Sequence, residues 1–167
     1  KAMLGDFQQA RELVAHAQQV LRERLRIPRP RLFLGLRTAG VEVLAGNPEA
    51  AERALRPALE VALMVADRDQ ASQIAAELSL LLSRRGASEE AARAATLAAG
   101  QAPAESVTAQ ALAGAARARV LLGSGDHREA ERFAREAIKP VPDDMLNLRA
   151  SLLVGLAEIL RAAGRHD

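Results

Sequence analysis

The segment Gly125-Asp126-His127-Arg128-Glu129-Ala130 is one of several in which a glycine leads into a helix start with alanine at the fifth following position. Related segments begin at Gly5, Gly46 and Gly86, and Gly164 begins a further one. Successive glycines are separated by 41, 40, 39 and 39 residues. A constant period of this length predicts a repeat protein in which each unit buries its apolar face against its neighbour. Such architectures usually present binding or scaffolding surfaces.

Between the glycines, apolar residues recur every three or four positions, which is the spacing of amphipathic helices. We predict eight helices, at about residues 6–26, 31–45, 48–66, 70–85, from 88 onward, 105–123, 127–138 and 143–164. Asp6 and Ser88 are expected to be N-caps, and the prolines in 27–30 to end the first helix. The short connections predict antiparallel neighbours. The expected fold is therefore an all-α solenoid of helix hairpins, with residues 1–167 as a single helical-repeat domain.

The composition favours helices and disfavours direct binding of nucleic acid. Apolar residues make up 49% of the chain but aromatic residues only 2%, so alanine and leucine must provide the packing. The sequence pI is about 9.9, yet the formal net charge is only +2. Because the chain has no basic run and few aromatic residues to stack on bases, we expect no direct contact with nucleic acid.

No stretch of the sequence predicts a membrane span, because no apolar run approaches the roughly 18 residues required. The absence of cysteine excludes disulfides and thiolate chemistry. These features are consistent with a cytoplasmic protein. The chain opens at Lys1, without a methionine and close to a helix start, so we expect it to be a fragment of a larger multidomain protein.

The repeated positions resemble those of tetratricopeptide repeats. Small residues recur five and twelve positions after each glycine: Ala10, Ala51, Ala91 and Ala130, and Ala17, Ala58, Ala98 and Ala137. The closing proline of that family is matched by Pro103 and Pro142, whereas Arg22 and Leu63 stand at the other two equivalent positions. The resemblance implies divergent, longer repeats in which the small residues are contact points between paired helices.

A narrower resemblance involves residues 5–13 and 40–53, and continues in 113–137 and 152–164. These segments look like the C-terminal repeats of large bacterial signalling proteins, in which a nucleotide cyclase domain and an AAA-type ATPase domain precede the array. Similar arrays follow the ATPase modules of large bacterial transcriptional regulators. The resemblance implies a regulatory, non-catalytic role for this segment.

The sequence contains no motif for a metal, a nucleotide or another cofactor. Its three histidines, His16, His127 and His166, are dispersed, and neither a Walker motif nor GxGxxG is present. The run 123–126 is better interpreted as a turn between helices than as an anion-binding nest. The adjacent Asp143 and Asp144 are better interpreted as residues of a helix start than as an acid/base pair.

The first helix of each hairpin is expected to line a concave face. Counting back from each glycine, the charged residues that would point into it are Arg37, Glu77, Arg119, Glu158 and Arg161. We predict these residues as candidate binding residues, with ordinary surface positions as the alternative. The carboxylate clamp of chaperone-binding tetratricopeptide domains is disfavoured, since its asparagine and lysine are missing here.

Two functions from different classes follow. The first is a non-catalytic module that binds another protein or another domain of its own chain. The second is a sensor domain that binds a small effector, which a groove cavity lined by Leu80, Leu122 and the groove arginines would favour. An enzyme is a more distant third.

The two ends of the array are expected to expose apolar residues, because each unit of a linear stack is covered only by its neighbours. The residues concerned are Leu13, Val14 and Leu21 at one end, and Leu153, Leu156 or Leu160 at the other. We therefore predict an apolar patch that supports homo-association or contact with further domains.

Overall fold

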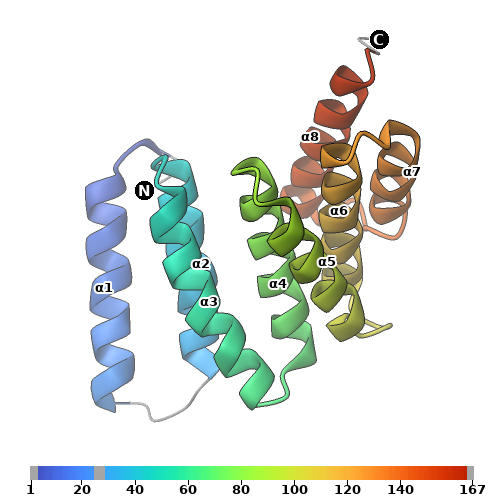
Figure 1. Ribbon diagram of the computed structural model, residues 1–167. Coiled ribbons are helices and arrows are strands. Elements are labelled where there is room, and N and C mark those ends of the chain that lie inside the picture. Colours follow the sequence, from blue (N-terminus) through green and yellow to red (C-terminus); the bar gives the residue numbers. More distant parts are fainter. Residues whose placement is uncertain (1–3, 25–28, 165–167) are drawn as a thin grey trace. The chain divides into compact units, whose positions relative to one another are not determined.

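The computed structural model describes residues 4–24 and 29–164, with the side chains of 21–32 outside that description. The described residues form eight α-helices and no strand. The helices are α1 (Phe7–Arg24), α2 (Arg29–Leu44), α3 (Pro48–Met64), α4 (Arg68–Arg84), α5 (Ser88–Gln101), α6 (Val107–Gly123), α7 (His127–Ile138) and α8 (Leu146–Ala162) (Figure 1). The all-α prediction is confirmed.

The helices belong to two compact units, residues 1–70 and 71–167, which are described separately. In the first unit α2 packs against both α1 and α3. In the second, α5 packs on α6, α6 on α7, and α7 on α8, while α6 also contacts α8 directly. Contact between α6 and α8 joins the first helices of successive hairpins, as expected of stacked repeats.

The repeat glycines that follow α2, α4, α6 and α8 mark the ends of these helices, as the sequence indicated. Gly5, Gly46, Gly86, Gly125 and Gly164 all have positive φ, between 74° and 83°. After α6, the Gly125 amide donates to the Leu122 carbonyl at 3.1 Å and the Asp126 amide to the Leu121 carbonyl at 3.0 Å. This double hydrogen bond is the Schellman arrangement, which satisfies carbonyls at the helix end.

The turn between α3 and α4 has the same arrangement without glycine. The Ala66 amide donates to the Leu63 carbonyl at 3.2 Å, and the Asp67 amide to the Ala62 carbonyl at 3.0 Å. Ala66 therefore takes a φ of 55°, a left-handed conformation that is unfavourable for a residue with a Cβ. The sequence predicted a break between helices at this point, with one helix ending near 66 and the next beginning near 70, but the absence of a glycine gave no sign of a left-handed residue.

Helix starts agree with the sequence at some caps and differ at others. Asp6 accepts from the Gln9 amide at 3.2 Å, as predicted. The N-cap prediction for Ser88 is wrong, because Ala87 precedes α5 and Ser88 is its first residue. Helix α2 begins at Arg29, earlier than expected, since a proline is tolerated in the first turn of a helix.

Other helix bounds shift by a few residues. Helix α6 begins at Val107 after the N-cap Ser106, and α8 begins at Leu146, so the aspartates at 143 and 144 precede α8 instead of starting it. The predicted end of the first helix at residues 25–28 lies outside the described residues. The described helix ends thus lie within a few residues of the capping and turn residues that predicted them.

Paired helices cross at small residues. A Cβ built on Gly35 would lie 2.5 Å from the Cβ of Ala58, and one built on Gly114 would lie 2.9 Å from the Cβ of Ala137. Both glycines stand eleven positions before a repeat glycine, and both alanines twelve positions after it. The same close crossing therefore occurs between α2 and α3 in one unit and between α6 and α7 in the other.

Helices α4 and α5 are joined instead by buried hydroxyl groups. Ser72 Oγ donates to the Ala98 carbonyl at 2.9 Å, and Ser79 Oγ donates to the Ala91 carbonyl at 2.8 Å. Both serines are fully buried. Ala91 and Ala98 are two of the small repeat positions, so these contact points lie where the sequence placed them.

Candidate functional site

The residues predicted to line a binding face fall on the first helices of the hairpins. Arg37 lies on α2 in the first unit, and Glu77, Arg119, Glu158 and Arg161 lie on α4, α6 and α8 in the second. Of these five, the structure brings Arg119 and Glu158 together. The binding role of all five stays a prediction.

Arg119 Nη1 donates to Glu158 Oε2 at 2.7 Å. The two residues are 39 positions apart, and each stands six positions before its repeat glycine. Their side chains are 26% and 31% exposed, so the ion pair is accessible at the surface of α6 and α8. A charge-assisted hydrogen bond of this kind fixes the guanidinium in place and leaves other donors available.

A cavity of about 290 Å³ lies beside this ion pair, between the ends of α4 and α6 and the start of α5. Arg119 and three hydroxyl residues, Ser83, Ser88 and Ser124, contribute to its lining, together with Glu89. The Ser83 Oγ is buried and has no hydrogen-bond partner among the described residues. Of the other two hydroxyl groups, that of Ser124 donates to the Leu121 carbonyl at 2.9 Å, and Ser88 is exposed. Such a lining has donors and acceptors for the carbonyls or carboxylate of a peptide.

The other three predicted residues, Arg37, Glu77 and Arg161, lie on α2, α4 and α8. Glu77 is exposed on α4, although the surrounding protein desolvates its carboxyl group and raises its pKa, with Arg84 acting in the opposite direction. Arg161 is exposed near the end of α8. The Arg37 guanidinium lies 5.0 Å from the centre of the Phe33 ring, one turn earlier on α2.

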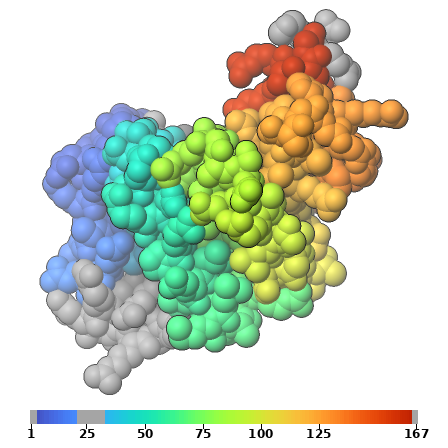
Figure 2. All heavy atoms as spheres, in the orientation of Figure 1, coloured from blue at the N-terminus to red at the C-terminus, as the bar shows by residue number. Residues whose placement is uncertain are grey.

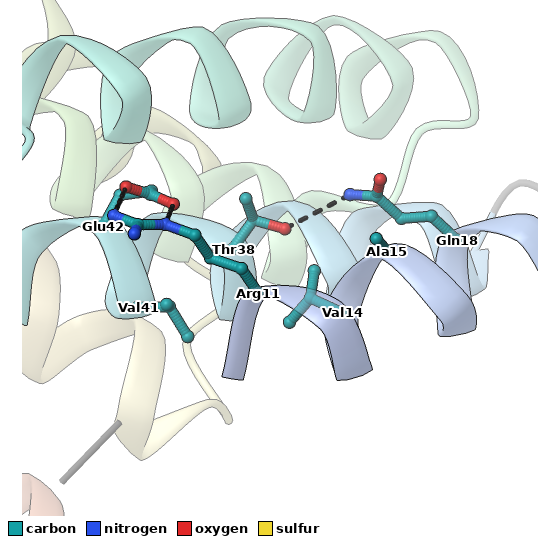
Figure 3. Close-up of a pocket in the computed structure, with 7 residues that line it drawn as sticks. All are labelled: Arg11, Val14, Ala15, Gln18, Thr38, Val41 and Glu42. Atoms are coloured by element: carbon teal, nitrogen blue, oxygen red, sulfur yellow. Dashed lines mark hydrogen bonds and ion pairs between the residues drawn. The ribbon is translucent and has the colours of Figure 1, made fainter. Parts of the chain in front are cut away.

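The first unit contains a second cavity, of about 230 Å³, between α1 and α2. Figure 3 shows Glu42 and Val41 toward one end of it and Gln18 and Ala15 toward the other, with Arg11 and Thr38 between them. Gln18 Nε2 donates to Thr38 Oγ1 at 3.3 Å. Polar and apolar side chains thus alternate along the cavity.

Arg11 and Glu42 form the tightest polar contact of this cavity. Arg11 Nε donates to Glu42 Oε1 at 2.7 Å and Arg11 Nη2 to Glu42 Oε2 at 2.8 Å, a two-point ion pair. Asn47 Nδ2 donates to Glu42 Oε2 at 3.1 Å. The hydrogen bond from Arg11, together with that from Asn47, holds the pKa of the buried Glu42 below its ordinary value.

Sequence reasoning missed this pair, although a signal was present. Glu42 stands four positions before its repeat glycine, where the other units have Leu82, Leu121 and Leu160. Comparing the residues at this one repeat position would have identified Glu42 as a buried acid that needs a partner. It would not have identified Arg11, which lies 31 residues away on another helix.

Within residues 4–24 and 29–164, no group of three or more His, Asp or Glu side chains could hold a metal ion. No helix in the described part of the chain is both long and apolar enough to span a membrane.

Comparison with known proteins supports the fold class. No protein-family model matches the chain, and no curated protein sequence is similar to it. Among solved structures, it resembles the crystal structure of BtubC (BKLC) from P. vanneervenii, with a TM-score of 0.69 and 16% sequence identity. The match covers 97% of this chain and 68% of that one.

At this level of identity the similarity concerns the fold alone. Together with the helix order and the recurring helix crossings, it defines an all-α protein with a helical-repeat-like fold.

Proposed function

We propose that this chain is a non-catalytic interaction module built from tetratricopeptide-like repeats, and that it binds a protein partner or another domain of its own chain. The observation that carries the proposal is the ion pair between Arg119 and Glu158. It links equivalent positions of two repeats and lies beside a cavity that contains hydroxyl groups. Extended binding surfaces of repeat proteins are formed by such recurring positions on successive units.

The finer assignment to tetratricopeptide-like repeats is supported by the recurring small contacts. Gly35 meets Ala58 and Gly114 meets Ala137 at the same repeat positions, and the alanines belong to the pattern that the sequence shares with that family. The narrower assignment, to a cytoplasmic array in a bacterial cyclase/ATPase signalling protein or a related transcriptional regulator, rests on the sequence resemblance.

The chemistry around Arg119 favours a peptide with acidic or carbonyl groups. Arg119 supplies guanidinium donors, and Ser83 supplies a hydroxyl group that lacks a partner in the described part of the chain. A peptide carboxylate could therefore replace Glu158 as the acceptor for Arg119 while its backbone pairs with the hydroxyl groups.

The alternative function is an effector sensor. Arg119 lines the cavity, but Leu80 and Leu122 are not among its lining residues, and Leu122 packs against the core of α6, α7 and α8. The cavity volume of about 290 Å³ also lies just below the roughly 300–1,000 Å³ of small-molecule sites. The protein-binding function is therefore favoured.

The experiment that tests the proposal is selection of peptides from a random display library on the purified chain. We expect acidic peptides whose binding is lost in Arg119→Ala and retained in Arg135→Ala, a matched change of an exposed arginine on α7. Selected peptides that bind both variants equally would contradict the role of Arg119. A thermal shift produced by a small metabolite, and abolished by Arg119→Ala, would favour the sensor instead.

A further inference from the structure

Helix α8 has two apolar faces, and its neighbours cover only one of them. Leu152, Leu156 and Ile159 are buried against α6 and α7. Leu146 and Leu153, on the other face, are 71% and 47% exposed. The sequence analysis expected Leu153, Leu156 or Leu160 to be exposed at this end. The structure exposes Leu153, buries Leu156 and half-buries Leu160 against the core. In Figure 2 the atoms of α8, in red, lie beyond those of α7 at the end of this unit.

The preceding repeat shows what such a face normally contacts. Gly114 and Ala118 of α6 stand 39 positions before Leu153 and Ala157 of α8. On α6 these residues face α7, with Gly114 against Ala137 and Ala118 in a buried cluster with alanines of α7. The exposed face of α8 therefore corresponds to a face that another helix covers within the same unit.

Gly114, which permits the close crossing of α6 and α7, is replaced by a leucine at the equivalent position of α8. Leu153 stands where α6 has Gly114, at which even a Cβ would lie 2.9 Å from the facing helix. A leucine at this point excludes a helix packed as closely as α7 is on α6. Whatever covers α8 must lie farther from its axis and must accommodate leucine side chains.

The exposed face has the spacing of a coiled-coil seam. Its exposed residues are Leu146, Ala150, Leu153 and Ala157, and the half-buried Leu160, which also packs against the core formed with α6 and α7, continues the series; the separations are four, three, four and three positions. This spacing places leucine at every d position and alanine at every a position of a heptad repeat. Because large and small residues alternate, the seam is complementary to a reversed copy of itself: Leu146 and Leu153 can each pack over an alanine.

The charges at the two ends of α8 favour the same reversed arrangement. Arg161 is exposed near the C-terminal end and has no ion-pair partner in the described part of the chain. Asp144 is exposed just before the N-terminal end. When two copies of α8 run antiparallel, Arg161 of each copy lies near Asp144 of the other, and the opposed helix dipoles attract as well.

We propose that α8 pairs with α8 of a second copy of this chain, in an antiparallel two-fold interface formed by the seam of Leu146, Ala150, Leu153, Ala157 and Leu160. Leu146 of one copy packs over Ala157 of the other, and Leu153 over Ala150. Such an interface is self-complementary and closes at two copies instead of extending into a filament.

The test is sedimentation equilibrium of the 167-residue chain over a concentration series. We expect a particle of twice the 17.8 kDa chain mass. Leu153→Glu should raise the dissociation constant at least about 30-fold, because it places an unpaired charge at the centre of the seam. The matched control is Leu13→Glu, a change of an exposed leucine on α1 that should leave dimerisation unchanged. Circular dichroism verifies that both variants are folded.

Charge reversal tests whether the two α8 helices run antiparallel. This test does not depend on whether α8 tolerates a glutamate in place of Leu153. Arg161→Glu and Asp144→Arg should each weaken the dimer by about 2- to 5-fold, and the double variant should restore it. A chain that stays monomeric at its highest soluble concentration would overturn the proposal. So would a double variant weaker than both single ones, or a loss of association in Leu13→Glu equal to that in Leu153→Glu, which would indicate head-to-tail stacking.

Discussion

Arg11 of α1 and Glu42 of α2 form a two-point ion pair. Glu42 stands at the repeat position at which the other units have leucine. Glu42 is buried, whereas Arg11 keeps 38% of its side chain exposed. The acid therefore depends on its partner more than the arginine does, because a buried charge without a partner is costly.

This asymmetry predicts unequal effects of the two single changes. Arg11→Ala should destabilise the chain by about 1–3 kcal/mol, since it leaves a buried carboxylate without its main partner. Glu42→Leu should change stability by less than about 1 kcal/mol, because it restores the leucine of the other repeats and Arg11 can reach water. Urea unfolding measures both. A larger loss in Glu42→Leu than in Arg11→Ala would mean that the pair itself provides net stability.

The same pair predicts a dependence of stability on acid pH. Arg11 lowers the pKa of Glu42 in the folded chain, so the unfolded chain binds more protons at acid pH. The contribution is fully present above the unfolded pKa of about 4.3 and is lost as the pH falls through the lower folded pKa. Urea unfolding at a series of pH values should show a shallower loss in Arg11→Ala than in the unaltered chain. Arg135→Ala, which removes an exposed pair on α7, should keep the original slope.

The close helix crossings predict opposite effects of adding one methyl group at two glycines of α2. Gly35→Ala should destabilise the chain by about 1–3 kcal/mol, because the new Cβ overlaps with Ala58 and overpacks the crossing. Gly40→Ala, where a Cβ would meet no atom within 4 Å, should stabilise it by up to about 1 kcal/mol through higher helix propensity. Thermal melts compare the two. Stabilisation by both changes would show that α2 and α3 separate easily at this point.

The turn at Ala66 predicts a stabilising substitution. Ala66→Gly should raise stability by about 1 kcal/mol, because glycine takes a positive φ without the Cβ clash. The reverse change at the equivalent turn, Gly86→Ala, should lower stability by about the same amount. Equal melting temperatures for Ala66→Gly and the unaltered chain would mean that this turn relaxes in solution.

Because the small residues at the repeat positions are fully buried, we predict that larger side chains there lower the stability of the chain. Ala51→Leu or Ala130→Leu should destabilise the chain by about 1–3 kcal/mol, since both alanines have no exposed surface. Ala99→Leu, an exposed position of α5, is the matched control and should be close to neutral. A melting temperature that does not change in the first two variants would show that the core has unoccupied space around these residues.

The sequence by itself determined the number of helices, their order and most of their ends. Gly46, Gly86 and Gly125 marked turns with positive φ, and Asp6 marked a helix start, because these signals act within about one turn of the chain. It also identified Arg119 and Glu158 as surface candidates from their repeat position. The repeat spacing was sufficient for this because each unit folds by the same local rules.

Only the tertiary structure decided which of these residues meet. Arg11 and Glu42 are 31 positions apart, and Arg119 and Glu158 are 39 apart, so each contact depends on how closely two separate helices pack. The distance between two helices is set by the side chains along the whole crossing, as Gly114 against Ala137 shows for α6 and α7. Leu153 shows both contributions. The sequence placed it at the end of the array, but only the packing of α6 on α7 revealed that the equivalent residue of α6, Gly114, is a point of close helix contact.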